Sequence, residues 1–346
     1  MAGPEAIEGP KPPGISRIVR GLVFAALGSA VVSAALVVVG DGPAVAAALR
    51  GFDLLTLVWM LLLGAVSFAV RSVRWGALMR VVGHPVSLGD ALYLQVSGQA
   101  MTVTPGRVGE VVKPWLAREL SGMRLTRGVS LVFAERVADL IAVCVLALGG
   151  LSALGGATWV LVLGIAVVVG GTALAGSSWF HGLALRAVRS RERARAHEAS
   201  AEAIADTLGR ALHWRVLAWS VPASVVAWGL EGVGFVLCLH AFGFGTLDAF
   251  AGVSVYAVAT IAGAFSFLPG GIGLTEASMA GVLIAAGMPA AAASGATLVT
   301  RVATLWWGVL LGWIALSSRP QLLKRVLGGS GEGESAQMSE AGSRFL

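Results

Sequence analysis

Two arginine residues, Arg136 and Arg301, lie inside long apolar stretches rather than at their ends. If each stretch is a transmembrane helix, these arginines lie about nine and eleven residues from its start, near mid-bilayer at about 1.5 Å per residue. A charge at that depth costs at least about 2.5–3.5 kcal/mol on insertion scales, so it needs a partner or a wet cavity. Because a guanidinium group binds phosphate through two parallel hydrogen bonds, the chemistry on offer is recognition of an anion.

Carboxylates occur close to both arginines in the sequence. Glu110 and Asp139 flank the first arginine, and Glu276 precedes the second. Purely structural ion pairing within the protein is therefore the alternative to binding an external anion. Glu135 projects from a different face of its helix than its neighbour Arg136, and we expect it at the membrane interface.

Each arginine also follows a turn that contains proline, glycine and a glutamate. The first turn comprises Pro105, Gly106, Arg107, Val108, Gly109 and Glu110, and the second comprises Pro269, Gly270, Gly271, Ile272, Gly273, Leu274, Thr275 and Glu276. Arg136 follows Pro105 by 31 residues, and Arg301 follows Pro269 by 32. Matched features in the same order predict an internal repeat, with chance similarity of two glycine-rich stretches as the alternative.

Broken backbone inside a bilayer is tolerated only within protein or beside water, and glycine makes such breaks possible. The helix that begins after each turn presents free N–H groups and the positive end of its dipole. Two such helix ends and two mid-bilayer arginines would form an anion site, and the obvious anion in a membrane is a lipid phosphate. Arg107, in the first turn, and Arg71 and Arg74 are further candidate phosphate ligands, although the last two also fit an interfacial belt of snorkelling side chains.

Composition indicates a membrane protein. Of the 346 residues, 56% are hydrophobic and 13% charged, whereas a soluble domain carries about 25% charged residues. Cys144 and Cys238 fall in apolar stretches, which favours small buried hydrophobes over a disulfide. The histidines lack metal-ligand spacing, and no phosphate-binding loop or hydrolase motif occurs. We therefore expect no metal, no cofactor, no catalytic residue and no nucleic-acid partner.

Apolar runs predict an all-α polytopic fold with about six full spans at 18–40, 53–72, 128–150, 157–177, 216–241 and 290–317. Two further segments, 88–104 and 249–268, run into the proline–glycine turns and predict re-entrant or broken helical hairpins, so eight spans remain possible. We expect a transmembrane domain over 17–320, with inverted halves at about 53–177 and 216–317. The flanking segments 1–16 and 321–346 are expected to be disordered and cytoplasmic.

Basic residues gather in alternate connections. They occur before the first span, in 71–80 and 106–127, in the loop 186–215 and after the last span, whereas the opposite loops hold only Asp41 and Arg50. The positive-inside rule then places both termini in the cytoplasm of a multi-pass protein of the inner membrane. The two repeats enter from opposite sides, which is the inverted architecture of many transporters.

Four short sequence motifs and one downstream arginine carry a family resemblance. They are Arg71-x-x-Arg74-Trp75, Pro105-Gly106-Arg107-x-Gly109-Glu110, Glu135-Arg136-x-x-Asp139 and Pro269-Gly270-Gly271-Ile272-Gly273-x-x-Glu276, with Arg301 downstream. Over about residues 15–320 the chain resembles the flippase-like transmembrane family named after lysylphosphatidylglycerol synthase. The resemblance implies a polytopic inner-membrane protein that handles lipids. Synthase members add a large C-terminal domain that aminoacylates the lipid. After the last span this chain closes with a tail of about 20 residues, so lysylation by it is not expected, and the identity of the lipid stays open.

The leading hypothesis is a flippase for an anionic, phosphate-bearing lipid: a phospholipid, an aminoacyl-lipid or a sugar linked to polyprenyl phosphate. A membrane enzyme that modifies a lipid headgroup is one alternative, with Glu110, Asp139 and Glu276 as its buried acid–base candidates. A non-catalytic partner of a glycosyltransferase or lipid synthase is the other. The sequence leaves the oligomeric state, the energy source and the direction of transport open.

Overall fold

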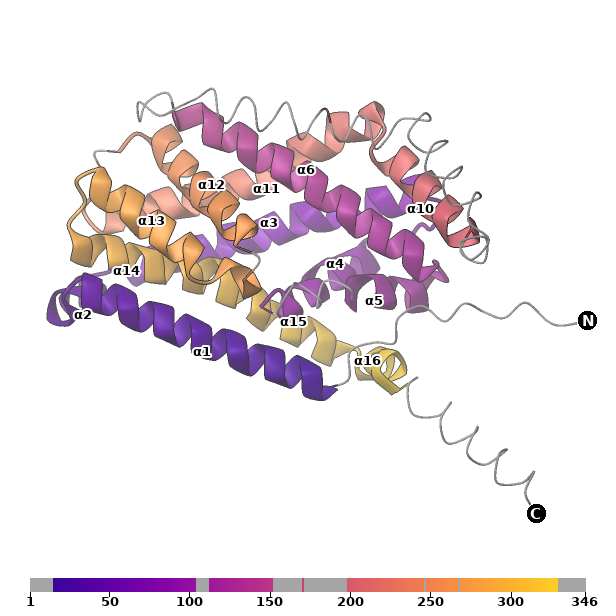
Figure 1. Ribbon diagram of the computed structural model, residues 1–346, viewed down its shortest axis with the longest axis horizontal. Helices are drawn as coiled ribbons and strands as arrows, with labels where there is room; N and C mark the ends of the chain where they lie inside the picture. Colours follow the sequence, from indigo (N-terminus) through magenta and orange to yellow (C-terminus); the bar gives the residue numbers. More distant parts are fainter. Residues whose placement is uncertain are drawn as a thin grey trace, which may run out of the picture.

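The computed structural model describes residues 15–103, 112–151, 170, 198–245, 247–266 and 268–328. Every regular element within these residues is a helix, which confirms the all-α prediction (Figure 1). The first predicted turn, 105–110, and the predicted span 157–177, apart from the single residue 170, lie outside the described residues. Cys144 and Cys238 are buried free thiols, as predicted.

The chain begins with α1 (Ile15–Val39), α2 (Gly42–Arg50) and α3 (Leu54–Val81). Helix α2 is bent by 100° from the part of α1 that precedes it. Asp53 caps α3, because its carboxylate accepts hydrogen bonds from the N–H groups of Leu55 and Thr56.

A short helix, α4 (Leu88–Ser97), continues into the 3-10 helix η1 (Gly98–Met101). Together they are too short to cross a hydrocarbon core of about 30 Å, which agrees with a re-entrant segment over 88–104. The first half continues with α5 (Val112–Ser121) and α6 (Leu125–Leu151).

The second half comprises α10 (Glu198–Ala211), α11 (Trp214–Ala241), α12 (Ala249–Phe265), the short 3-10 helix η3 (Pro269–Gly271) and α13 (Leu274–Ala285). Helix α14 (Ala290–Arg301), the π-helical turn η4 (Val302–Trp306) and α15 (Trp307–Ser318) then form one continuous helix. Pro320–Gly328 form α16, so the expectation of disorder from residue 321 is wrong for the residues up to 328. Proline at the first position of a helix and apolar residues among its polar ones explain this short helix.

By length and composition, three described helices can cross a membrane: α3, α11 and the continuous Ala290–Ser318, with α1 and α2 as a fourth if the bent pair is one span. Helix α6 has 27 residues, which is long enough, but Glu135, Arg136 and Asp139 lie near its middle. Helix α12 has 17 residues and stops at the second turn. The described part therefore contains long helices alternating with short broken ones, as a polytopic fold with re-entrant segments predicts.

The two halves pack in matching ways. Helices α3 and α11 lie against each other and run in opposite directions (Figure 1). Helix α4 packs on α3 and α15, just as α12 packs on α11 and α6. Val103, which follows η1, shares a buried apolar cluster with Ile272 and Leu305, so the ends of the two short helices meet inside the molecule. This exchange of equivalent contacts agrees with the predicted inverted repeat.

The start of α1, α10 and α16 lie toward one end of the molecule, whereas α2 and the connection from α13 to α14 lie at the other (Figure 1). Basic residues of the described segments at this end include Arg17, Arg20, Arg210 and Arg325. The positive-inside rule therefore predicts that this end is cytoplasmic.

This orientation predicts the labelling of single cysteines in a variant with alanine at Cys144 and Cys238. Ala286→Cys, exposed between α13 and α14, should react with an impermeant thiol reagent in intact cells. Gln321→Cys, exposed on α16, should react only after permeabilisation. The reverse pattern would invert the predicted topology.

The close contact of α15 with η1 predicts a stability difference between two glycines. A Cβ atom at Gly312 would overlap the backbone of Ala100, whereas nothing lies within 4 Å of the corresponding position at Gly281 on α13. Gly312→Ala should therefore destabilise the protein by about 1–3 kcal/mol. Gly281→Ala should be neutral or stabilising, and melting temperatures in detergent measure both. Equal melting temperatures would show that α15 and η1 do not pack as described.

Candidate functional site

A cavity of about 120 Å³ lies between the two halves. Arg71 from α3, Arg136 from α6 and Arg301 from α14 all line it. This volume is several times the roughly 10–15 Å³ that one buried water molecule needs, so the cavity has room for a small polar group. Its other polar walls are Gln99, Thr102, Glu231, Tyr256, Thr260, Thr275 and Thr304. The structure thus brings together three of the five arginines predicted as phosphate ligands.

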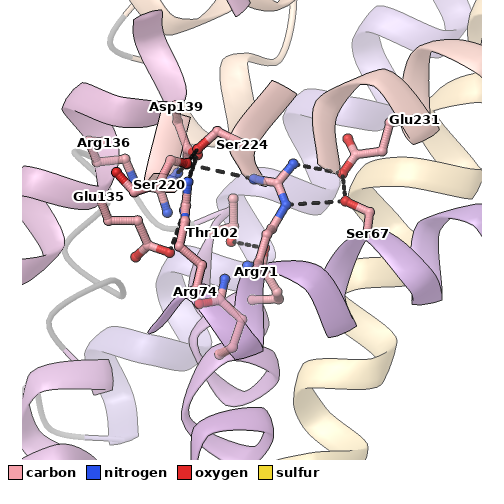
Figure 2. A network of polar contacts seen from close by, with 12 residues as sticks. Ser67, Arg71, Arg74, Thr102, Glu135, Arg136, Asp139, Ser220, Ser224 and Glu231 are labelled. Atoms are coloured by element: carbon pink, nitrogen blue, oxygen red, sulfur yellow. Dashed lines mark hydrogen bonds and ion pairs between the residues drawn. The ribbon is translucent and has the colours of Figure 1, made fainter. Parts of the chain in front are cut away.

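Arg71 connects three helices (Figure 2). Its Nη2 donates to Glu231 Oε1 on α11 at 2.9 Å, and its Nη1 lies 3.6 Å from Asp139 Oδ2 on α6. Its Nε donates to Ser67 Oγ at 3.2 Å, and its guanidinium carbon lies 4.2 Å from the centre of the Trp228 ring. Arg71 is 5% exposed, so an interfacial snorkelling role is wrong. It lies inside the protein, at the cavity.

Glu231 is held at both oxygens. The Ser67 hydroxyl donates to Oε1 at 2.9 Å and the Tyr256 hydroxyl donates to Oε2 at 2.7 Å, in addition to the bond from Arg71. These donors come from α3 and α12, so one carboxylate on α11 joins helices of both halves. Hydrogen bonds of this kind, with an ionised acceptor, are about twice as strong as neutral ones.

Arg74, one helical turn beyond Arg71, is buried away from the cavity lining. It donates to Asp139 Oδ1 at 2.6 Å, to Glu135 Oε1 at 2.8 Å and to Ser224 Oγ. With 2% exposure it holds α3, α6 and α11 together rather than forming an interfacial belt. Both terminal nitrogens of Arg74 are thus engaged by other residues of the protein, as expected of a structural cation.

Glu135 is also deeper than expected. It is 1% exposed, so the expectation of an interfacial position is wrong. Its second oxygen accepts from Lys113 Nζ at 2.7 Å, and that ammonium also donates to Gln95 and lies 3.4 Å from the centre of the Trp75 ring. These partners on α3, α4 and α5 hold the carboxylate inside the protein, because a buried charge needs charged or hydrogen-bonding groups around it.

Arg136 faces the cavity with 34% of its side chain exposed, and its Nη1 lies 3.4 Å from Asp139 Oδ2. The alternative partner, Glu110, lies outside the described residues, as do Pro105, Gly106, Arg107 and Gly109. The predicted pairing of Arg136 with Asp139 is confirmed, and it coexists with a place in the cavity wall.

Arg301 ties the second turn to the last long helix. Its Nε donates to Glu276 Oε1 at 2.5 Å and its Nη2 donates to the carbonyl oxygen of Gly270 at 2.7 Å. Glu276 Oε2 in turn accepts from the N–H of Gly273 at 2.6 Å, at the start of α13. The predicted pair of Arg301 with Glu276 is confirmed, and Arg301 lines the cavity as well.

The second turn needs its glycines. Gly270, Gly271 and Gly273 have φ angles of 60°, 68° and 97°, which residues with a side chain rarely adopt. Gly270 and Gly271 line the cavity, so backbone rather than side chain faces the enclosed space there. The π-helical turn η4 follows Arg301 directly, and such turns often occur at functional sites.

Sequence reasoning missed Glu231, Lys113 and Tyr256. Glu231 is the single acidic residue of the predicted span 216–241, so the cost argument that selected Arg136 and Arg301 could have selected it too. No local pattern marks Tyr256 or Lys113. Among the described residues, no group of three or more His, Cys, Asp or Glu side chains is arranged to hold a metal ion.

The burial of Arg74 predicts unequal effects of two arginine substitutions on stability. Arg74→Gln leaves Glu135 and Asp139 short of a buried cation and should cost about 3–5 kcal/mol. Arg136→Gln, at a side chain one third exposed, should cost clearly less. Thermal unfolding in detergent measures both, and equal losses would refute the division into a structural and a cavity-facing arginine.

Comparison with known proteins identifies the family of the chain. Residues 25–312 match the family described as the lysylphosphatidylglycerol synthase TM region. Two proteins of Methanothermobacter thermautotrophicus, each described as a UPF0104 membrane protein, are similar to it. One is 26% identical, with 71% of this chain and 78% of the relative covered, and the other is 24% identical, with 86% and 95% covered. The match to the family extends over most of the described fold and includes all three cavity arginines, so this chain is a membrane protein that belongs to the family of the lysylphosphatidylglycerol synthase TM region.

Proposed function

We propose that this protein translocates an anionic, phosphate-bearing lipid across the inner membrane by passing its headgroup through the central cavity. The observation that carries the proposal is the convergence of Arg71, Arg136 and Arg301 on one cavity, from helices of both halves. Guanidinium groups suit the several acceptor oxygens of a phosphate. The chain belongs to a family that is named after a lipid synthase, which agrees with a lipid-related role.

The position of the cavity suits transport. It lies between inverted halves, which is where substrate sites of many secondary transporters occur. Rocking of one half against the other would expose the headgroup first to one side and then to the other, while the acyl chains stay in lipid. Hydroxyl and amide groups on the cavity wall, such as Gln99, Thr102 and Thr275, offer the headgroup neutral hydrogen-bond partners.

Reconstitution tests this function against the two alternatives. Purified full-length protein in vesicles would be supplied with fluorescent phosphatidylglycerol, lysylphosphatidylglycerol or a polyprenyl-phosphate sugar, with a labelled neutral glycolipid as control. Translocation of a phosphate-bearing lipid without covalent change supports the proposal. Turnover of the headgroup supports an enzyme instead, and neither process supports a partner of a lipid synthase or glycosyltransferase.

Variants of Arg301 and Glu276 separate lipid binding from internal pairing. Arg301→Lys keeps the charge but loses the two-pronged geometry, so we expect translocation to fall at least about tenfold, or 1.4 kcal/mol, while the protein still folds. Arg301→Gln strands Glu276 and should be both unstable and inactive. The double variant Arg301→Gln with Glu276→Gln should regain thermal stability but not translocation.

The double variant decides between the two readings of Arg301. Translocation at the wild-type rate by the double variant would show that Arg301 only neutralises Glu276. Glu276→Gln alone serves as the matched single variant, because it leaves the guanidinium in place.

A further inference from the structure

We infer that translocation is coupled to protons: Glu231 takes up one proton for each anionic headgroup that binds Arg71, so that headgroup and proton cross together. The inference rests on the proposed function and adds its energy source. It begins from the fact that Arg71 and Glu231 form an ion pair and both line the cavity. An anion in the cavity therefore competes with the Glu231 carboxylate for the same guanidinium group.

Arg71 has few free positions for a second anion. Its Nε is bonded to Ser67, its Nη1 faces Asp139, and Trp228 lies over its guanidinium group. Of the hydrogen bonds and ion pairs of Arg71 described above, the bond from Nη2 to Glu231 is the one to another residue that lines the cavity. A phosphate that bonds to Arg71 from the cavity thus replaces Glu231 most directly.

A displaced carboxylate would be costly. The Glu231 side chain is 9% exposed, and a carboxylate buried without its cation takes up a proton rather than remain charged. The hydroxyl groups of Ser67 and Tyr256 can then stay in place, because a hydroxyl both donates and accepts hydrogen bonds. The proton comes from water on the side to which the cavity is open, and no other group is altered.

The exchange leaves the charge of the site unchanged. One negative headgroup and one proton arrive together, so the loaded cavity carries the same charge as the empty one. Moving such a neutral load avoids the cost of carrying a net charge through a medium of low dielectric constant. A proton gradient would then drive the lipid from the acidic side to the alkaline side.

The charged and titratable groups around Glu231 come from every helix that packs on α11 in its neighbourhood. Helix α3 contributes Arg71, α6 contributes Arg136 and Asp139, α12 contributes Tyr256 and α14 contributes Arg301. Helix α10 packs near Val216, at the far start of α11. Arginines thus dominate the surroundings of Glu231, and a bound phosphate would engage just these groups.

The other buried carboxylates of the described residues keep their cations when the cavity fills. Asp139 contacts Arg71, Arg74 and Arg136, and Glu135 contacts Arg74 and Lys113. Each therefore retains a cation, Arg74, that does not line the cavity.

Glu276 pairs with Arg301, and it also accepts from a backbone N–H at the positive end of α13 and lies outside the cavity lining. Among the described acidic residues, Glu231 alone lines the cavity. It is the carboxylate whose charge balance depends on what the cavity holds.

The first test measures proton uptake on lipid binding. Dioctanoylphosphatidylglycerol is added to full-length protein in weakly buffered detergent solution, and bound lipid and bound protons are both counted. We expect about one proton for each lipid bound by the wild type at neutral pH. Glu231→Gln should bind the lipid without proton uptake, because the amide cannot titrate. Glu119→Gln, at an exposed carboxylate on α5, should behave like the wild type, and dioctanoylglycerol should elicit no uptake.

The second test measures transport in vesicles with a pH gradient. In vesicles with an alkaline lumen, wild-type protein should move labelled phosphatidylglycerol to the inner leaflet and should acidify the lumen as protons enter with the lipid. Glu231→Gln should move it with no dependence on the gradient. Tyr256→Phe removes a donor to the same carboxylate, so the pH dependence of proton uptake should differ from that of the wild type.

The outcomes separate the inference from the proposed function. Lipid binding or translocation by the wild type without proton uptake, or equal proton uptake by Glu231→Gln, overturns proton coupling and leaves translocation standing. Absence of binding and translocation for every phosphate-bearing lipid overturns the proposed function, and the coupling with it. A folding check by thermal unfolding accompanies each variant, and Tyr256→Phe tests the same carboxylate if Glu231→Gln does not fold.

Discussion

The ion pairs of Arg71 are the interaction on which the arrangement of this protein depends. A guanidinium group in the middle of an apolar helix is stable only where other chains of the fold supply acceptors. Arg71 receives them from α11 through Glu231 and from α6 through Asp139, and Arg74 repeats the pattern one turn later. The three helices are therefore fixed relative to one another by charge, in an environment where apolar side chains gain little from meeting each other rather than lipid.

In the second half an arginine is also satisfied by other parts of the fold, but a backbone carbonyl group takes the place of a second carboxylate. Arg301 bonds to Glu276 and to the carbonyl oxygen of Gly270, so it neutralises a charge and satisfies a broken piece of backbone together. Both halves thus place an arginine that stabilises the fold at the wall of the cavity between them. Binding and stability share these residues, and an anion that enters must exchange partners with groups already paired. Such exchange is how a ligand with different contacts in two states shifts the balance between them.

Much of this could be predicted from the sequence because the cost of a charge in a membrane is local. The pairing of Arg301 with Glu276 and the glycine-dependent second turn both follow from short stretches of chain. The inward position of Glu135 could not be predicted, because Lys113 and Arg74 reach it from other helices. Glu231 on α11 is bonded to Ser67 and Arg71 on α3, far away in sequence, and to Tyr256 on α12. No pattern within one helix reveals which helix faces meet. Arg74 appeared equivalent to Arg71 by spacing, and only packing separates the structural arginine from the one at the cavity.

The central claim is that the arginines between the two halves hold a lipid phosphate. Imaging of the full-length wild-type protein by electron cryomicroscopy, in nanodiscs of phosphatidylglycerol and phosphatidylethanolamine, tests it most directly. We expect a headgroup in the cavity, with its phosphate within hydrogen-bond distance of Arg71 or Arg301 and with Glu231 moved away from any arginine that the phosphate engages. A cavity that contains only water at saturating lipid, with lipids confined to the outer surface and the pair of Arg71 and Glu231 intact in every conformation, would contradict it.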